Sequence, residues 1–156
     1  MDDLIAQYNN VHSSGLPLIS ELAASKGQNS SSSDSTPSQT VHADLKQSDI
    51  EYKLSAIIQN LSDILTEMYL CANAMDQSTQ NAGKCSDLGT ISTTETNSPD
   101  SKSDSINLHS LCLQYEKETQ LKELVVNLVS SSDSLCPKEQ LGHLVSLYRH
   151  YLYIVK

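Results

Sequence analysis

The stretch "SDIEYKLSAIIQNLSDILTEMYLCANAM", residues 48–75, carries the clearest structural pattern in the chain. Apolar side chains recur along it at alternating intervals of four and three residues, which is the repeat of a coiled coil or helical bundle. The two apolar positions of this repeat are occupied by Leu54, Leu61, Met68 and Met75, and by Ile50, Ile57, Ile64 and Cys71. The pattern predicts one long amphipathic helix over residues 43–77.

The beginning and the width of this helix also follow from the pattern. Ser48 and Glu51 form the Ser-x-x-Glu motif of a capping box, so we expect the helix to begin near Ser48. Ile58, Leu65 and Ala72 add a third apolar position beside the repeat. The stripe is therefore wider than a two-stranded coiled coil needs, and it favours a bundle of three or four helices.

The flanking segments show weaker helical patterns. Residues 1–24 are predicted as a short helical segment. Because it contains Gly15 and Pro17, it is either one weak helix or a pair of helices. Residues 106–156 are predicted as a helical hairpin, broken by the serine-rich run at 130–134. With no convincing alternating strand, the fold class is all-α, with amphipathic helices that form part of a helical bundle or coiled coil.

Two details of the hairpin carry specific expectations. Glu118 and Lys122 are four residues apart in the favourable order, which predicts an exposed ion pair on a solvated face. The last helix is predicted to begin at Pro137 and to continue to the last residue of the chain. Its seven-residue repeat includes Leu141, Tyr148 and Val155.

Polar tracts at residues 25–42 and 78–105 are too poor in apolar side chains to offset the entropy of ordering, so we predict long disordered linkers there. Thr36 and Ser98 each precede a proline in these tracts. They are minimal sites for proline-directed phosphorylation, although so short a motif arises easily by chance.

Composition and charge exclude several classes of function. The formal net charge is -9, with 10 basic residues. The sequence shows no cluster of basic residues that would form a face for direct binding of nucleic acid. No apolar run approaches the roughly 20 residues that a membrane span requires, and the acidic start does not resemble a secretory signal. We therefore expect an intracellular protein without a membrane span, in which the scattered cysteines are small buried side chains.

Motifs for catalysis, cofactors and metals are not found in the sequence. No glycine-rich phosphate loop, metalloprotease helix or nucleophile elbow occurs. His109 and Cys112 share a helical face, but two ligands leave a tetrahedral zinc site incomplete. We expect no catalytic residues, no cofactor, no metal site and no small-molecule substrate.

A function in protein assembly fits the wide apolar stripes better. We expect partner helices from other subunits to cover part of these stripes. The expected partner-binding residues are Leu54, Ile57, Leu61, Ile64, Leu65, Leu144, Tyr148 and Leu152.

The segment "ELVVNLVSSSDSLCPKEQLGHLVSLYR", residues 123–149, resembles the C-terminal helical region of the Mediator complex subunit 9 family. The similarity is carried by Leu135, Pro137, Glu139, Gln140, Leu144, Leu147 and Arg149. Residues 50–68 loosely match the preceding helix of that family. The resemblance implies a small non-catalytic subunit of a nuclear transcription coactivator, packed against other Mediator subunits.

Two other interpretations use the same helices. One is a helical component of a vesicle-tethering or kinetochore complex, for which exclusion from the nucleus would be the discriminating observation. The other is a self-contained bundle that binds a small apolar ligand, for which an enclosed pocket in a folded monomer would be the evidence.

Overall fold

The computed structural model of the chain describes residues 1–29, 37–84, 101–131 and 137–154. These residues form four α-helices and no strand. The helices are α1 (Asp2–Asn29), α2 (Pro37–Lys84), α3 (Ser101–Ser131) and α4 (Lys138–Arg149). The all-α prediction is confirmed.

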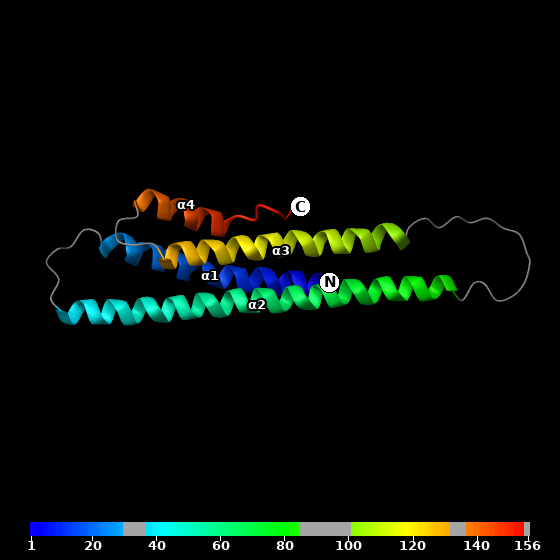
Figure 1. Cartoon of the computed structure of the whole chain (residues 1–156), viewed down its shortest axis with the longest axis horizontal. Helices are drawn as coiled ribbons and strands as arrows, with labels where there is room; N and C mark the ends of the chain where they lie inside the picture. The colour runs from blue at the N-terminus through cyan, green and yellow to red at the C-terminus, as the bar shows by residue number, and fades with distance from the viewer. Residues whose placement is uncertain (30–36, 85–100, 132–136, 155–156) are drawn as a thin grey trace, which may run out of the picture.

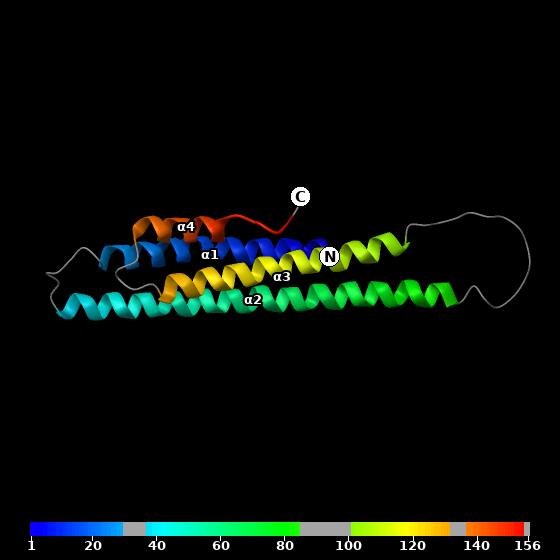
Figure 2. The same ribbon diagram turned by 45° about the horizontal axis from the view of Figure 1, so that its top comes forward.

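The helices are arranged as a long bundle (Figures 1 and 2). α1, α2 and α3 lie side by side, and each runs antiparallel to the one before it. The much shorter α4 packs on α1 and α3, near the C-terminal ends of both, on the side away from α2. In both views α2 and α3 extend beyond the N-terminal end of α1.

The seven-residue repeat of α2 forms the centre of the bundle. Leu54, Leu61 and Met68 are completely buried, and Ile50, Ile57 and Ile64 are buried beside them. The last member of the repeat, Met75, is 49% exposed. Burial of one such side chain contributes about 1.5–3 kcal/mol, so this stripe is the main apolar contribution of α2.

The core divides into two clusters along the bundle. The cluster at the α4 end combines Leu54 of α2 with Ile19 and Leu22 of α1, Val125 of α3 and Tyr148 of α4. The second cluster lies toward the start of α1 and is covered there by the chain that follows α4. It includes Tyr8, Leu61, Leu65, Met68, Cys112 and Tyr115. α2 contributes residues to both clusters, so its apolar stripe extends along both.

The expected start of the long helix is wrong. α2 begins at Pro37, so Ser48 is an exposed residue within the helix and no capping box forms there. Glu51 instead accepts a hydrogen bond from Gln47 Nε2 (3.1 Å) and lies 3.7 Å from the ammonium group of Lys26. The backbone N–H groups near Ser48 are bonded within the helix and need no cap.

The helices also extend into the segments predicted as linkers. Residues 25–29, 37–42, 78–84 and 101–105 are helical, whereas the rest of both tracts, with Thr36 and Ser98, lies outside the described residues. A polar composition does not prevent helix formation when the residues continue a helix that is already nucleated.

α1 is a single helix, although it contains Pro17. Proline leaves the carbonyl oxygen of the residue four positions earlier, here Ser13, without its intrahelical donor. Pro17 and Ser13 are both exposed, so water can bond to this carbonyl oxygen and the helix continues.

The last helix is shorter than predicted. α4 ends at Arg149, and His150 has extended backbone angles (φ -90°, ψ 146°). Leu152, which a continuous helix would place on the apolar stripe, is 54% exposed. Buried polar side chains of α1 and α3 bond to the backbone at this point, as described below, and these bonds favour an end to the helix.

None of the helices in the described parts of the chain is long and apolar enough to cross a lipid bilayer.

Candidate functional site

The structure places most of the predicted partner-binding residues inside the chain's own core. Six are buried: Leu54, Ile57, Leu61, Ile64, Leu65 and Tyr148. Leu144 is half-buried and Leu152 is exposed. The buried six are covered by neighbouring helices of the same chain, so a partner would reach them only if the bundle opened. Partner binding by Leu152, or by the accessible part of Leu144, requires no such change.

Exposed leucines of α3 and α4 form a more accessible apolar area. Leu124 and Leu128 of α3 are 54% and 43% exposed, and Leu147 of α4 is 37% exposed. Leu121 and Leu144 are half-buried beside them. We call these five residues the leucine surface. Leu121, Leu124 and Leu128 share one face of α3, because their spacing is three and four residues.

Hydrogen bonds between α3 and the end of α4 align the two helices. Lys122 Nζ donates to the carbonyl oxygen of Leu147 at 3.1 Å. Because α4 runs antiparallel to α3, Leu144 lies beside the part of α3 that follows Lys122. The stretches of α3 and α4 that carry these leucines therefore overlap along the bundle.

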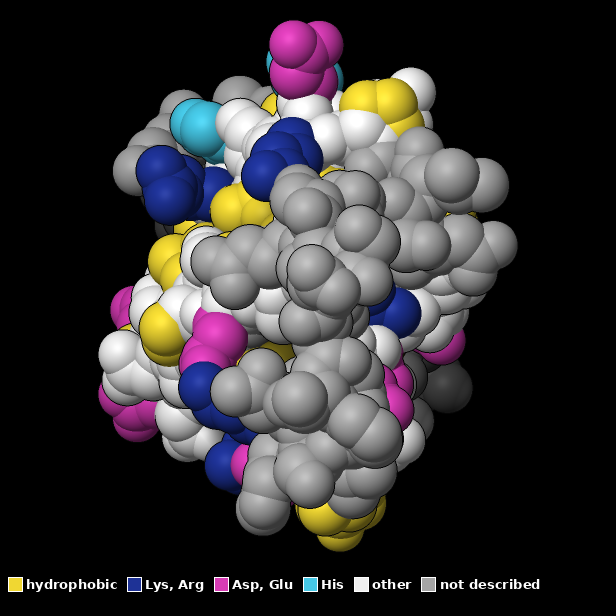
Figure 3. All heavy atoms as spheres, turned by 90° about the vertical axis from the view of Figure 1, so that its left-hand side faces the viewer, with side chains coloured by type: hydrophobic (Ala, Val, Ile, Leu, Met, Phe, Trp, Pro, Cys, Tyr) yellow, Lys and Arg dark blue, Asp and Glu magenta, His cyan; other side chains and the backbone are white. Residues whose placement is uncertain are grey.

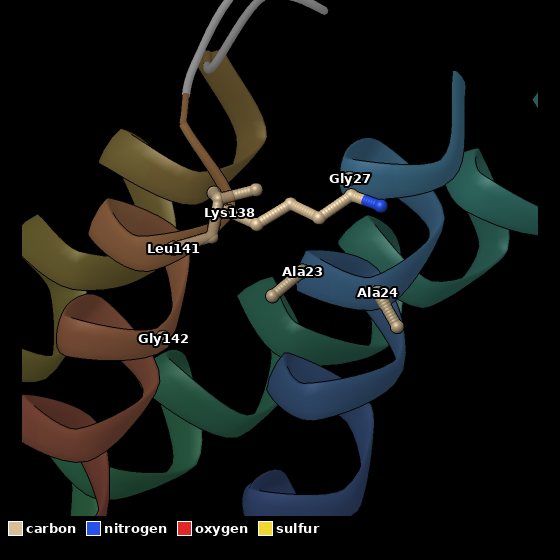
Figure 4. A pocket seen from close by; sticks show the side chains of 6 residues that line it. All are labelled: Ala23, Ala24, Gly27, Lys138, Leu141 and Gly142. Carbon is tan, nitrogen blue, oxygen red and sulfur yellow. The ribbon is translucent and has the colours of Figure 1, made fainter. Parts of the chain in front are cut away.

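The opposite side of α4 faces α1 (Figure 4). A gap of about 320 Å³ lies there between Ala23, Ala24 and Gly27 of α1 and Gly142 of α4. The side chain of Lys138 extends across it toward Gly27. The residues that face α1 and the residues of the leucine surface occupy different sides of α4, so Leu144 and Leu147 point toward the α3 side.

A buried polar cluster fixes the position of α4. Glu118 and Lys122 are completely buried, with Lys122 Nζ 2.5 Å from Glu118 Oε1. Lys122 also donates to the carbonyl oxygens of Leu147 and His150 (3.1 and 2.5 Å). The expectation of an exposed ion pair is thus wrong. We call Glu118, Lys122 and the nearby His12 the polar anchor.

The sequence contains a signal that the pair would be buried. Glu118 precedes Val125 by seven residues, and Lys122 precedes Val129 by seven residues. Val125 and Val129 are both buried, so the charged pair continues the apolar face of α3. The spacing of four residues between the two charges alone could not distinguish an exposed pair from a buried one.

Lys122 provides a hydrogen-bond donor for carbonyl oxygens at the C-terminal end of α4. The last carbonyl oxygens of a helix lack intrahelical donors and carry partial negative charge, so a buried ammonium group is favourable there. The ammonium group also lies 5.5 Å from the ring centre of Tyr148 and 5.6 Å from that of Tyr151. Burial lowers the pKa of Lys122, and the carboxylate of Glu118 opposes this shift.

His12 of α1 makes a third bond to the same backbone. Its Nε2 lies 2.8 Å from the carbonyl oxygen of Tyr148, and a carbonyl oxygen only accepts, so Nε2 carries the hydrogen. The imidazole ring stacks on the Tyr148 ring at 5.2 Å between centres. Burial lowers the pKa of His12, and the charge of Lys122 adds to this effect, whereas the hydrogen bond to Tyr148 opposes it. The neutral ring is therefore favoured near pH 7.

Glu118 holds the chain that follows α4. Its Oε2 accepts hydrogen bonds from the backbone N–H groups of Leu152 (2.9 Å) and Tyr153 (3.1 Å). The hydroxyl group of Tyr151 donates to Asn9 Oδ1 at 2.9 Å. The polar anchor thus joins α1, α3, α4 and residues 150–154, and it positions one side of the leucine surface.

The described residues contain no group of three or more His, Cys, Asp or Glu side chains placed to hold a metal ion. His109 Nε2 is within 3.0 Å of Asn73 Oδ1, and Cys112 is buried in the core. The charged groups of the polar anchor bond to one another and to backbone groups, an arrangement that stabilises a fold.

The charged side chains are mixed at the end of the bundle where α4 begins. Figure 3 views this end and shows lysine and arginine side chains distributed among acidic and apolar ones, without one continuous basic area on the visible face. Electrostatic attraction to an extended polyanion depends on such an area.

No protein-family model matches the chain, and no curated protein shows significant similarity to it.

Proposed function

We propose that this protein is a non-catalytic helical subunit of a multiprotein assembly, and that the leucine surface binds an amphipathic helix of another subunit. The observation that carries the proposal is the exposure of Leu124, Leu128 and Leu147 on two helices that pack together.

The geometry suits a helical partner. An amphipathic helix presents apolar side chains at intervals of three and four residues, and two adjacent helices offer a shallow channel that receives them. Full burial of one exposed leucine contributes about 1.5–3 kcal/mol, before the costs of association. Contacts with several leucines would therefore support a specific complex.

The rigid support of this surface favours binding over catalysis. α4 has 12 residues, and a helix of this length is marginal alone in water. The polar anchor and Tyr148 fix it on α1 and α3, so the leucines of α4 are held ready before a partner arrives. Preorganisation of this kind lowers the entropic cost of binding.

The proposed assembly is a Mediator-like transcription coactivator in the nucleus. This part of the proposal is supported by the resemblance of residues 123–149, which include four of the five members of the leucine surface. The alternative is a cytoplasmic vesicle-tethering or kinetochore complex, in which a helical subunit would bind its partners through the same surface.

The proposal is tested by capture of partners with matched variants of the full chain. Leu124→Ser combined with Leu128→Ser removes the α3 half of the leucine surface. Leu45→Ser combined with Tyr52→Ser is the control, because these two side chains are also exposed but lie on α2. Circular dichroism first verifies that both proteins remain helical, and quantitative mass spectrometry then compares the proteins that each captures in its native cells.

We expect the α3 variant to lose a defined set of helical subunits that the wild type and the α2 variant retain. Equal capture by all three proteins would refute the leucine surface as the binding site. Mediator subunits in the lost set would support the nuclear assignment, whereas tethering or kinetochore subunits, with exclusion of the chain from the nucleus, would refute it.

A further inference from the structure

A second candidate site lies on the other half of the bundle, away from the leucine surface. It is a hollow of about 450 Å³ between the first half of α1, α3 and the chain that follows α4. Its lining residues are Ile5, Asn9, Ser13, Tyr115, Tyr151 and Ile154.

The hollow exists because α4 ends early. Ile5, Asn9 and Ser13 are four residues apart and form one face of α1. Beyond Arg149 the chain leaves the helix, and Tyr151 reaches α1 through its hydrogen bond to Asn9. This extended segment is thinner than a helix, so it leaves space between itself and α1.

The lining is mainly apolar and aromatic. Tyr115 is 4% exposed, and its ring packs edge-on against Tyr8 at 4.7 Å between centres. The hydroxyl group of Tyr8 is hydrogen-bonded to Thr119 Oγ1 (2.9 Å), so Tyr8 belongs to the core and not to the lining of the hollow. Ile5, Ile154 and the rings of Tyr115 and Tyr151 therefore supply the apolar walls.

A few polar groups accompany these walls. The Oδ1 atom of Asn9 accepts from Tyr151, which leaves the N–H donors of its amide group for another acceptor. The hydroxyl group of Ser13 donates to the backbone oxygen of Asn9 at 2.7 Å. Tyr115 also lines the hollow, and a phenol hydroxyl group can donate a hydrogen bond. A ligand in this space would find one or two hydrogen-bonding groups beside a mostly apolar wall.

The neighbouring charges are already neutralised. The buried charged residues Glu118 and Lys122 bond to each other and to backbone groups of His150 and Leu152. None of the lining residues that the structure describes is charged. A charged ligand would lose its hydration without gaining a counter-charge, which is costly.

We propose that this hollow binds a small neutral molecule with an aromatic or branched aliphatic body and one hydroxyl or carbonyl group. The volume and the lining are those of ordinary small-molecule sites, which occupy about 300–1,000 Å³ and combine apolar walls with a few polar groups. This site is separate from the leucine surface and does not depend on the proposed assembly.

The test uses 4-methylphenol as the probe and nuclear magnetic resonance of isoleucine methyl groups in the full chain. Saturable shifts are expected for the methyl groups of Ile5 and Ile154. 4-Methylbenzoate has a similar body but carries a carboxylate, and we expect it to bind at least about tenfold more weakly.

Two adjacent serines supply the matched variants. Ser13→Phe should fill the hollow and abolish the saturable shifts. Ser14→Phe is the control, because Ser14 is also exposed and also bonds to its own helix, through Val11 O, but does not line the hollow. Amide resonances of Leu152 and Tyr153 show whether the segment after α4 stays in place in both variants.

The absence of saturable shifts at millimolar concentrations of 4-methylphenol would overturn the proposal. Equal binding by the Ser13→Phe and Ser14→Phe proteins would also overturn it, because the probe would then lie elsewhere. Equal binding of 4-methylbenzoate would refute the neutral ligand class. Binding by wild type and Ser14→Phe alone supports the site, whatever partner capture shows.

Discussion

Replacement of Lys122 by methionine should destabilise the protein strongly. Methionine retains most of the apolar stem but removes the ammonium group. Glu118 would then be a buried carboxylate without its counter-charge, and the carbonyl oxygens of Leu147 and His150 would lose their donor. Loss of one partner from a buried ion pair costs about 3–5 kcal/mol. Small domains have only about 5–15 kcal/mol of stability, so the loss is a large fraction.

A second ion pair of the same chain provides the control. Asp49 and Lys53 have the same spacing and a similar distance of 2.6 Å, but their side chains are 57% and 55% exposed. Exposed helical pairs contribute about 0.3–0.5 kcal/mol. Lys53→Met should therefore change the free energy of unfolding by no more than that amount, and the comparison isolates burial as the cause.

The assay is urea unfolding followed by circular dichroism, combined with hydrogen exchange of individual amides. In Lys122→Met, the amides of Leu152 and Tyr153 should lose protection in the native state, because Glu118 is no longer held in place to accept from them. Addition of Glu118→Gln should recover part of the lost stability, since it removes the uncompensated charge. A cost for Lys122→Met that equals that of Lys53→Met would refute the reasoning, as would unchanged protection of the two amides.

Two further predictions concern the packing and the titration of the same region. Gly15→Ala should cost about 1–3 kcal/mol in urea unfolding, because a Cβ atom at this position would overlap the Tyr148 hydroxyl group; Gly142→Ala, with open space around it, should be neutral or stabilise α4 by up to about 1 kcal/mol. An equal loss for both variants would contradict this contact. Burial lowers the pKa of His12 below its value of 6.5 in the unfolded chain, so the unfolded state takes up its proton first and stability should fall as the pH decreases below about 6.5, by at most about 1.4 kcal/mol per pH unit for this group. His12→Gln should show a weaker decrease between pH 7.5 and 5.5, and an identical pH dependence in both proteins would exclude His12 as the cause.

The leucine surface could be predicted only in part. Leu121, Leu124 and Leu128 belong to the apolar pattern of α3, but so do Val125 and Val129, which are buried instead. The two sets lie on neighbouring faces of one helix. Which face is covered depends on where α1, α2 and α4 pack, and helical periodicity in a single segment does not contain this information.

The predicted helix ends show a similar limit. The Ser48–Glu51 motif predicted a helix start, and Pro17 left open a division of the first helix. The structure has continuous helix at both positions, because the other turns of each helix are stabilised by tertiary contacts. The true end of the last helix, at Arg149, coincides with hydrogen bonds from residues far away in the sequence. Local motifs are weak compared with packing and long-range bonds.

The sequence by itself determined the fold class and the central stripe of α2, because the period of the apolar side chains and the turn of the α-helix are both properties of one continuous segment. Only the tertiary structure decided that the Glu118–Lys122 pair is buried, that α4 stops where Lys122 and His12 meet its carbonyl groups, and that leucines of α3 and α4 stay exposed. The physical reason is that burial and hydrogen bonding of a side chain depend on segments far apart in the chain, whose approach is set by the packing of the whole bundle.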